Sequence, residues 1–214
     1  MTVVDDHRGQ ARDRITSRVW LKWPICTIAV LTITTVLTVL QFWFPGVRLA
    51  LWRDPAQIRA GQWWRLVTAL FVQYDRVWQI VSVLILVAAV GVFAERLYGH
   101  LNWLLIYLSC GVIGQAFGVL WLPHISDAGC SVAGAGLLGA VCAWLLSPVA
   151  PRLARVWVWA LAWLLVGIVL TAVSDMHGPP LLIGFSSGAL LLWHPQWRLS
   201  RRPRGHRQTL RVPD

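Results

Sequence analysis

Long apolar stretches alternate with short polar segments along most of this chain. A helix needs about 20 apolar residues to cross roughly 30 Å of hydrocarbon, and six stretches approach that length. They are predicted at Ile25–Phe44, from Val67 or Trp78 to Phe93, Trp103–Leu122, Ser131–Leu146, Leu153–Val173 and Pro179–Trp193. The pattern therefore predicts an all-α, polytopic membrane protein with six transmembrane helices, occupying residues 24–194.

The boundaries of two predicted spans carry further information. Asp75 and Arg76 interrupt the apolar run before the second span, so its start is open. Pro179 and Pro180 suit the first turn of the sixth helix, where a missing N–H costs nothing.

Between the first two spans, residues 45–65 are too polar to cross a membrane and too rich in Trp for a free linker. We expect them to form a structured loop at the membrane interface.

Composition supports a lipid environment. The chain is 57% hydrophobic and 13% charged, which is too little charge to cover the surface of a soluble domain. Mean hydropathy is +0.61. Many of the 15 Trp residues lie near predicted span ends, where amphipathic rings prefer to sit at the headgroups.

The charge distribution predicts the orientation. Net charge is +10, and basic residues gather in two tails, residues 1–23 and 195–214. Basic runs can indicate nucleic acid binding, but here both tails adjoin apolar spans, so the positive-inside rule explains them. With both termini cytoplasmic, 14 of the 19 Lys and Arg lie on the cytoplasmic side. We expect an integral plasma membrane protein, of bacterial inner-membrane type, whose partner is the lipid bilayer and not nucleic acid.

The four cysteines give no sign of a metal site. They lie in or beside apolar stretches and form no Cys-x-x-Cys pair, so neither zinc nor a disulfide framework is expected. No cofactor is predicted.

Four short motifs occur in a fixed order. Trp64-Arg65 closes the first loop, Glu95-Arg96 closes the second span, Gly129-x-Ser131 opens the fourth span, and small residues recur every fourth position in the fourth and sixth. These last are Gly136, Ala140, Gly184 and Gly188. The order of the motifs and of the intervening spans resembles the rhomboid family of intramembrane serine proteases, over roughly residues 45–193.

The resemblance implies a rhomboid-like bundle with a Ser–His dyad inside the membrane. Ser131 matches the nucleophile of the family's Gly-x-Ser motif, with Gly129 near the expected oxyanion. Trp64 and Arg65 match the loop motif that braces the fold, with Arg65 bonding loop carbonyls. Glu95 and Arg96 are expected to be a structural polar pair.

The small residues have a simpler expected role. Gly136, Gly184 and Gly188 form the close-packing pattern of membrane helices. We expect them to bring the fourth and sixth helices together whether or not chemistry occurs.

Ser131 has two interpretations on its own chemistry. At a helix N-terminus, unpaired N–H groups and the helix dipole can stabilise a developing oxyanion beside its hydroxyl. Alternatively, Ser131 is an ordinary N-cap that bonds a backbone N–H.

The sequence departs from the family pattern at the base and at the oxyanion. Leu181 occupies the position of the catalytic histidine, three residues before Gly184, and cannot accept a proton. The His and Asn that support the oxyanion in the second helix are missing from residues 78–83, although Gln79 and Ser82 can still donate hydrogen bonds. Val132 and Ala135 replace the glycine and tyrosine that usually follow the serine.

His177 is the candidate replacement base. It lies four residues before Leu181, which in a continuous helix is one turn, about 5.4 Å, too far along. We expect Gly178-Pro179-Pro180 to end the regular helix, so that His177 can fold back toward Ser131 with Asp175 orienting it. The alternative is a solvated loop histidine beside an acid. The other candidates, His100, His124 and His194, lie near predicted helix ends, where histidine is common at interfaces.

Two functional hypotheses follow from the resemblance. The first is a rhomboid-like protein that lacks the standard Ser–His dyad and binds or acts on transmembrane helices of client proteins. The alternative is an active intramembrane serine endopeptidase that uses Ser131 with His177 as a displaced base. A transporter or channel is disfavoured, because the central parts of the predicted spans contain almost none of the charged residues that such sites use.

Overall fold

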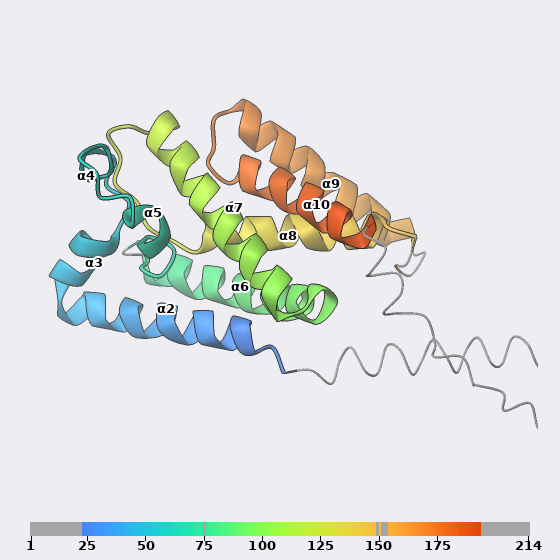
Figure 1. Ribbon diagram of the computed structural model, residues 1–214, viewed down its shortest axis with the longest axis horizontal. Coiled ribbons are helices and arrows are strands. Elements are labelled where there is room, and N and C mark those ends of the chain that lie inside the picture. Colours follow the sequence, from blue (N-terminus) through green and yellow to red (C-terminus); the bar gives the residue numbers. More distant parts are fainter. Residues whose placement is uncertain (1–22, 75, 149, 151–153, 194–214) are drawn as a thin grey trace, which may run out of the picture.

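The computed structural model describes residues 23–74, 76–148, 150 and 154–193, which form a bundle of α-helices (Figure 1). The helices are α2 (Ile25–Trp43), α3 (Pro45–Leu51), α4 (Pro55–Arg59), α5 (Arg65–Thr68), α6 (Val77–Tyr98), α7 (His100–Trp121), α8 (Ser131–Leu146), α9 (Ala154–Ala172) and α10 (Gly178–Trp193). The predicted basic tails and His194 lie almost entirely outside the described residues. The all-α fold class is confirmed.

The helix bounds follow the apolar stretches closely, with one exception. α6 continues to Tyr98 instead of ending at Phe93, and α7 already begins at His100. The intervening Gly99 has a φ of 81°, a left-handed conformation that glycine adopts without strain, so a single residue makes the turn. The charges of Glu95 and Arg96 therefore sit in the last turn of α6 and do not end it.

The number of membrane crossings remains a prediction. By length and composition, α2, α6 and α7 can each span a membrane, whereas α8, residues 156–172 and α10 are shorter apolar helices. Large apolar side chains on the outer helices are exposed, for example Ile28 and Val36 on α2 and Val158 and Leu165 on α9. Because lipid tails accept such a surface while the helix satisfies its own backbone, the bundle suits a bilayer.

The centre of the bundle is α8. Eleven of its 16 residues are buried, as expected of a helix that is apolar all round. It packs among α6, α7, α9 and α10. A Cβ built on Gly184 of α10 would overlap the carbonyl oxygen of Gly136. The two helices thus touch along their backbones, as small-residue packing allows.

The segment between α2 and α6 is an ordered loop. The buried Arg65 guanidinium donates hydrogen bonds to the carbonyl oxygens of Leu49 (2.9 Å) and Trp52 (3.1 Å). Its Nε donates to Gln62 Oε1 at 2.7 Å. Trp64 precedes α5 and is largely exposed. Arg65 therefore holds this loop in a fixed shape.

Glu95 joins three elements at the opposite end of α6. Its carboxylate accepts hydrogen bonds from the backbone N–H groups of Cys26 and Thr27, both at 2.8 Å, and from the Thr27 hydroxyl at 2.6 Å. It also pairs with His100 Nδ1. These N–H groups have no partner within α2, so Glu95 caps α2 from another helix. Arg96 follows it in the last turn of α6.

Candidate active site

Ser131 is the first residue of α8 and does not cap it. The cap position is Cys130, which makes no side-chain hydrogen bond to the helix end. Gly129 precedes it with a φ of 154°, and its N–H donates to the carbonyl oxygen of Ala69 at 2.9 Å. The Ser131 hydroxyl is engaged elsewhere, so its interpretation as an ordinary N-cap is wrong.

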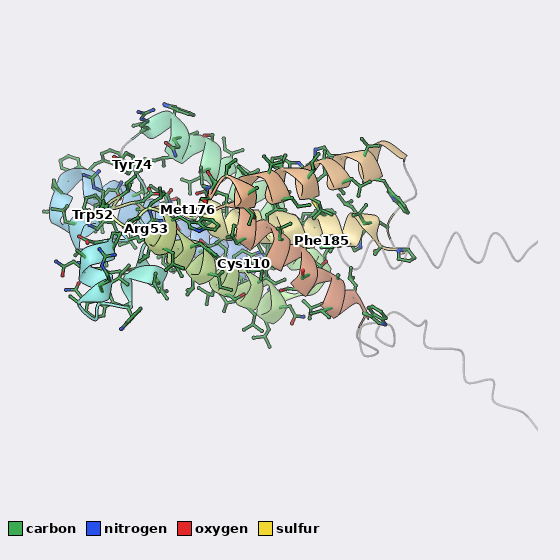
Figure 2. All side chains as sticks on the ribbon, turned by 90° about the horizontal axis from the view of Figure 1, so that it is seen from above. Trp52, Arg53, Tyr74, Cys110, Met176 and Phe185 are labelled. Carbon is green, nitrogen blue, oxygen red and sulfur yellow. The ribbon has the colours of Figure 1, made fainter. Side chains whose placement is uncertain are left out.

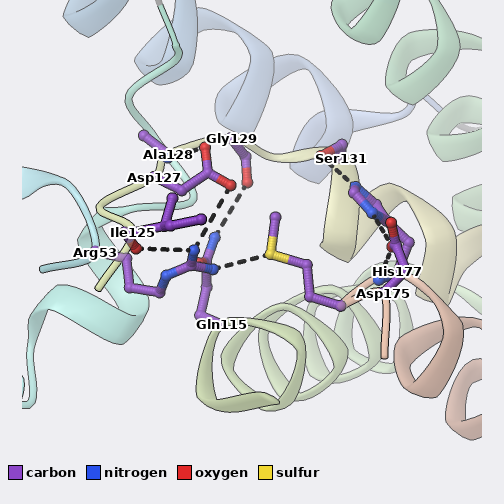
Figure 3. Close-up of polar contacts among 10 residues, drawn as sticks. Arg53, Gln115, Ile125, Asp127, Ala128, Gly129, Ser131, Asp175 and His177 are labelled. Atoms are coloured by element: carbon purple, nitrogen blue, oxygen red, sulfur yellow. Dashed lines mark hydrogen bonds and ion pairs between the residues drawn. The ribbon is translucent and has the colours of Figure 1, made fainter. Parts of the chain in front are cut away.

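The hydroxyl of Ser131 meets His177, which immediately precedes α10. Ser131 Oγ lies 2.9 Å from His177 Nε2 (Figure 3). The two residues are 46 positions apart in the chain, and the packing of α8 on α10 brings them together. This distance falls within the range of a nucleophile–base pair.

Asp175 orients the imidazole from its other side. Its Oδ1 lies 2.7 Å from His177 Nδ1 and also accepts the His177 backbone N–H at 2.9 Å. A carboxylate can only accept, so Nδ1 carries the proton and Nε2 is free to accept the Ser131 hydroxyl. The three side chains form a chain of hydrogen bonds in which the imidazole has the tautomer that a general base requires.

The environment of Asp175 keeps it ionised. Partial burial alone would raise the pKa of its carboxyl group, but the hydrogen bonds from the His177 backbone and ring, with the attraction of the imidazole, lower the pKa below its ordinary value. The Asp175 side chain is 42% exposed and that of His177 32%. The pair is therefore accessible from outside the bundle.

The turn that carries His177 is fixed by close packing of α9 on α10. Ser174 has a φ of 59°, and the Asp175 N–H donates to the carbonyl oxygen of Leu170 at 2.8 Å. A Cβ on Gly178 would overlap the backbone of Thr171. As expected, the regular helix stops at Gly178-Pro179-Pro180, because α10 begins at Gly178 with both prolines in its first turn and His177 lies in the turn before it.

Leu181, which the sequence pattern placed at the family's histidine position, belongs to the core. It is 2% exposed and packs with Leu138, Cys142 and Ala160. Its carbonyl oxygen lies against Gly139 of α8. An imidazole at this depth would lie among apolar side chains, whereas His177 lies at the head of the same helix, level with the start of α8.

Arg53 contacts both the loop that carries His177 and the loop that precedes Ser131. This fully buried side chain donates to Gln115 Oε1 (3.2 Å) and contacts Met176 Sδ (2.9 Å) (Figures 2 and 3). Its backbone forms an antiparallel bridge with Asp127, at 2.8 and 3.0 Å. Met176 adjoins His177 and Asp127 lies four residues before Ser131, so one arginine links the loop of the base to the loop of the nucleophile.

Burial of Arg53 has an electrostatic cost that its neighbours reduce. Burial lowers the pKa of its guanidinium, and Asp127 counteracts this with an ion pair at 3.7 Å. Gln115 extends the link, because its Nε2 donates to the carbonyl oxygen of Gly129 at 3.4 Å. A buried arginine in a loop is a signal that sequence patterning does not give, since burial depends on tertiary packing.

The remaining candidates lie away from the hydroxyl. Gln79 is in the first turn of α6 with an exposed side chain, and no contact within the described part of the chain joins it to Ser131. His124 is exposed. His100 pairs with Glu95 at the other end of α6. Gln73, which was not a candidate, is instead buried beside Cys130.

One cluster has ligand types that metals use. Atoms of Cys26, Glu95 and His100 lie within 4.8 Å of one another. The Glu95 oxygens already accept hydrogen bonds from the first turn of α2, which accounts for this carboxylate as a structural cap. All cysteines are free.

Comparison with known proteins identifies the relatives of this chain. The family model for the rhomboid domain matches residues 60–195. The chain is 36% identical over 89 residues to the rhomboid protease GluP of Bacillus subtilis (strain 168). That alignment covers 42% of this chain and 17% of the relative, so the chain spans only a small part of the relative's length. The family match includes both Ser131 and His177.

Proposed function

Because the chain belongs to the rhomboid family, we propose that it is an active intramembrane serine endopeptidase with Ser131 as nucleophile, His177 as general base and Asp175 as the residue that orients the base. The observation that carries this proposal is the 2.9 Å contact between Ser131 Oγ and His177 Nε2, continued at 2.7 Å from Nδ1 to Asp175. The resemblance alone favours loss of the dyad, since Leu181 stands at the usual histidine position. The geometry favours activity with the base displaced by one turn.

The proposed reaction is peptide hydrolysis by acyl transfer. Ser131 Oγ attacks the scissile carbonyl carbon while His177 Nε2 takes the hydroxyl proton, and the carbonyl π electrons move to the oxygen. The C–N bond then breaks, and the same proton passes from Nε2 to the leaving amine. Water, deprotonated by His177, attacks the acyl-enzyme, and Ser131 regains its proton when the C–O bond breaks. Every proton and bond is accounted for without a metal or cofactor.

The proposed substrates are transmembrane helices of client proteins. A peptide bond inside a helix is shielded by its own hydrogen bonds, so the client must unwind locally before Ser131 can reach a carbonyl. The proposed catalytic residues lie at the N-terminal ends of α8 and α10, close to the segment between α3 and α4, because Arg53 pairs with Asp127 and contacts Met176. This region is accessible at His177 and Asp175.

We further propose that the protein lies in the plasma membrane with both termini cytoplasmic, which places Ser131 toward the outer face. The basic tails support this orientation through the positive-inside rule. A green fluorescent protein fused to either terminus should fluoresce, whereas alkaline phosphatase fused there should be inactive. The reverse result would refute the orientation without touching the chemistry.

A non-catalytic rhomboid that binds client helices is the second candidate. The observation that favours it is Leu181, buried where the family pattern places the base. In that case clients co-purify with the protein, the amount is unchanged by Ser131→Ala, and no product of cleavage accumulates.

The deciding experiment is cleavage in reconstituted bilayers. Wild-type protein and Ser131→Ala are incorporated into liposomes with a tagged substrate whose transmembrane segment contains Gly and Ser near its outer end. We expect one specific product with wild type and none with the variant. Absence of any Ser131-dependent product across several such substrates would refute the protease and leave the binding role.

A further inference from the structure

Gln73 lies directly against the peptide that precedes the nucleophile. It lies in the segment between α5 and α6 and is 3% exposed. Its Nε2 lies 3.4 Å from the Sγ of Cys130. A second glutamine fixes its backbone, because Gln41 Nε2 donates to the Gln73 carbonyl oxygen at 2.9 Å and Gln41 Oε1 accepts the Gln73 N–H at 3.2 Å. The position of Gln73 is thus set independently of its side chain.

The absence of a Cβ at Gly129 leaves room for one atom between Gln73 and Ser131. A Cβ built on Gly129 would lie 3.5 Å from Gln73 Oε1, 3.5 Å from Ser131 Oγ and 4.0 Å from the Ser131 backbone nitrogen. The space therefore borders the attacking hydroxyl, a backbone N–H at the start of α8 and a buried carboxamide. Those are the surroundings that a carbonyl oxygen needs when it becomes negatively charged during attack on its carbon.

The carboxamide can turn its N–H₂ group toward this space. The oxygen and nitrogen of a glutamine side chain are assigned from their partners, and here the partner of Nε2 is a thiol. Burial raises the pKa of the Cys130 thiol to about 11, so the sulfur carries a hydrogen that a carboxamide oxygen can accept. Turned over, Gln73 keeps a hydrogen bond with Cys130 and presents Nε2 to the space beside Ser131.

We infer that Gln73 is an oxyanion donor of this enzyme, acting together with the backbone N–H of Ser131 in the space that Gly129 leaves open. This inference rests on the proposed protease function. As the Ser131 Oγ–carbon bond forms and His177 Nε2 takes the proton, the charge on the carbonyl oxygen is met by these two N–H donors. Gln73 thereby supplies what residues 78–83 lack in this chain.

The inference also assigns a reason to the Gly-x-Ser spacing. Any side chain at Gly129 would fill the oxyanion space, and its φ of 154° already disfavours other residues. The carbonyl oxygen of Gly129 is held by Gln115 and its N–H by Ala69. The peptide cannot easily move aside to make room.

A pair of glutamine substitutions tests the assignment. Gln73→Met keeps the length of the side chain without its donor, and Gln73→Glu keeps its shape while replacing the N–H₂ group by an oxygen. The matched control is Gln79→Met, in the exposed first turn of α6. Cleavage of the same transmembrane substrate in liposomes gives kcat and KM, and thermal denaturation in detergent checks folding.

We expect kcat to fall about 100-fold or more in both Gln73 variants, as for removal of one oxyanion donor elsewhere, with KM and the thermal midpoint close to wild type. Gln79→Met should retain wild-type kcat. If folded Gln73 variants keep the wild-type kcat, or if Gln79→Met loses activity instead, the assignment of Gln73 is overturned. Cleavage by the wild-type protein would still support the protease. If wild type shows no Ser131-dependent cleavage, the protease proposal fails and the oxyanion role falls with it. Should one Gln73 variant unfold, the other decides.

Discussion

Among the described residues, two carboxylate–histidine pairs occur, Glu95–His100 where α6 meets α7 and Asp175–His177 between α9 and α10, and their surroundings differ. The buried Glu95 carboxylate accepts hydrogen bonds from backbone N–H groups and a hydroxyl of α2, while the side chain of its partner His100 is 44% exposed. The half-exposed Asp175 carboxylate bonds the backbone and ring of His177, and the second ring nitrogen of His177 contacts a serine hydroxyl. A carboxylate beside a histidine is therefore not enough to indicate catalysis. The two pairs differ in what the second ring nitrogen of the histidine contacts.

The largest effect should come from replacing each histidine in turn. His177→Ala removes the proposed base, and loss of one member of a catalytic triad can cost on the order of 10⁶ in kcat. His100→Ala should leave kcat unchanged in the molecules that fold. Cleavage of a transmembrane substrate in liposomes measures both. Equal activity of the two variants would erase the distinction between the pairs.

Replacing each of the two carboxylates should separate effects on activity from effects on stability. Asp175→Asn allows the wrong imidazole tautomer, so kcat should fall by up to about 10⁴-fold with little change in thermal midpoint. Glu95→Gln sets an N–H₂ group among N–H donors and should destabilise the protein by about 1–3 kcal/mol, with kcat per folded molecule preserved. Thermal denaturation in detergent and active-site titration give the two readings. The pairs would be equivalent if both variants lost activity and stability together.

Close packing of α8 on α10 explains how the His177 ring reaches the Ser131 hydroxyl. Gly184→Ala places a methyl group in the Gly136 carbonyl, and we expect a loss of at least about 1–3 kcal/mol from overpacking, with lower activity as Ser131 and His177 separate. The matched control is Gly46→Ala, where a Cβ would meet nothing within 4 Å. Wild-type stability in Gly184→Ala would show that the helices can part without consequence.

The smallest effect concerns pH. The pKa of Asp175 is lowered in the folded protein from an ordinary value of 3.8. Ionised Asp175 therefore stabilises the fold above that pH, and this contribution is lost as the pH falls through the lower folded pKa. The thermal midpoints of wild type and Asp175→Asn should differ slightly near neutral pH, since exposed pairs are screened, and converge in acid. A difference in thermal midpoint that grows as the pH falls would contradict this prediction.

Much of the fold follows from the lengths of apolar runs and from small residues. The ends of α8 and the contact of Gly136 with Gly184 could be predicted because span length and helix packing are local constraints. The predicted C-terminal end of the second span was wrong, because α6 continues to Tyr98. Charged residues near the end of an apolar run need not stop a helix when Gly99 makes the turn.

The candidate site could be predicted only in part. Ser131, His177 and Asp175 are recognisable as residue types, but their meeting depends on where α10 begins relative to α8. Treating Leu181 as the reference placed His177 one turn too far along. Arg53 and Gln73 could not be found, because nothing local marks a buried polar side chain whose partners lie 57 to 123 residues away.

The central claim is that Ser131 reacts because His177 accepts its proton. It is tested most directly by treating the purified protein with a fluorophosphonate and mapping the adduct by peptide mass spectrometry. The structure predicts modification at Ser131 in wild type, and none at that residue in a folded His177→Ala variant. An unmodified Ser131, or one that reacts equally without His177, would contradict it.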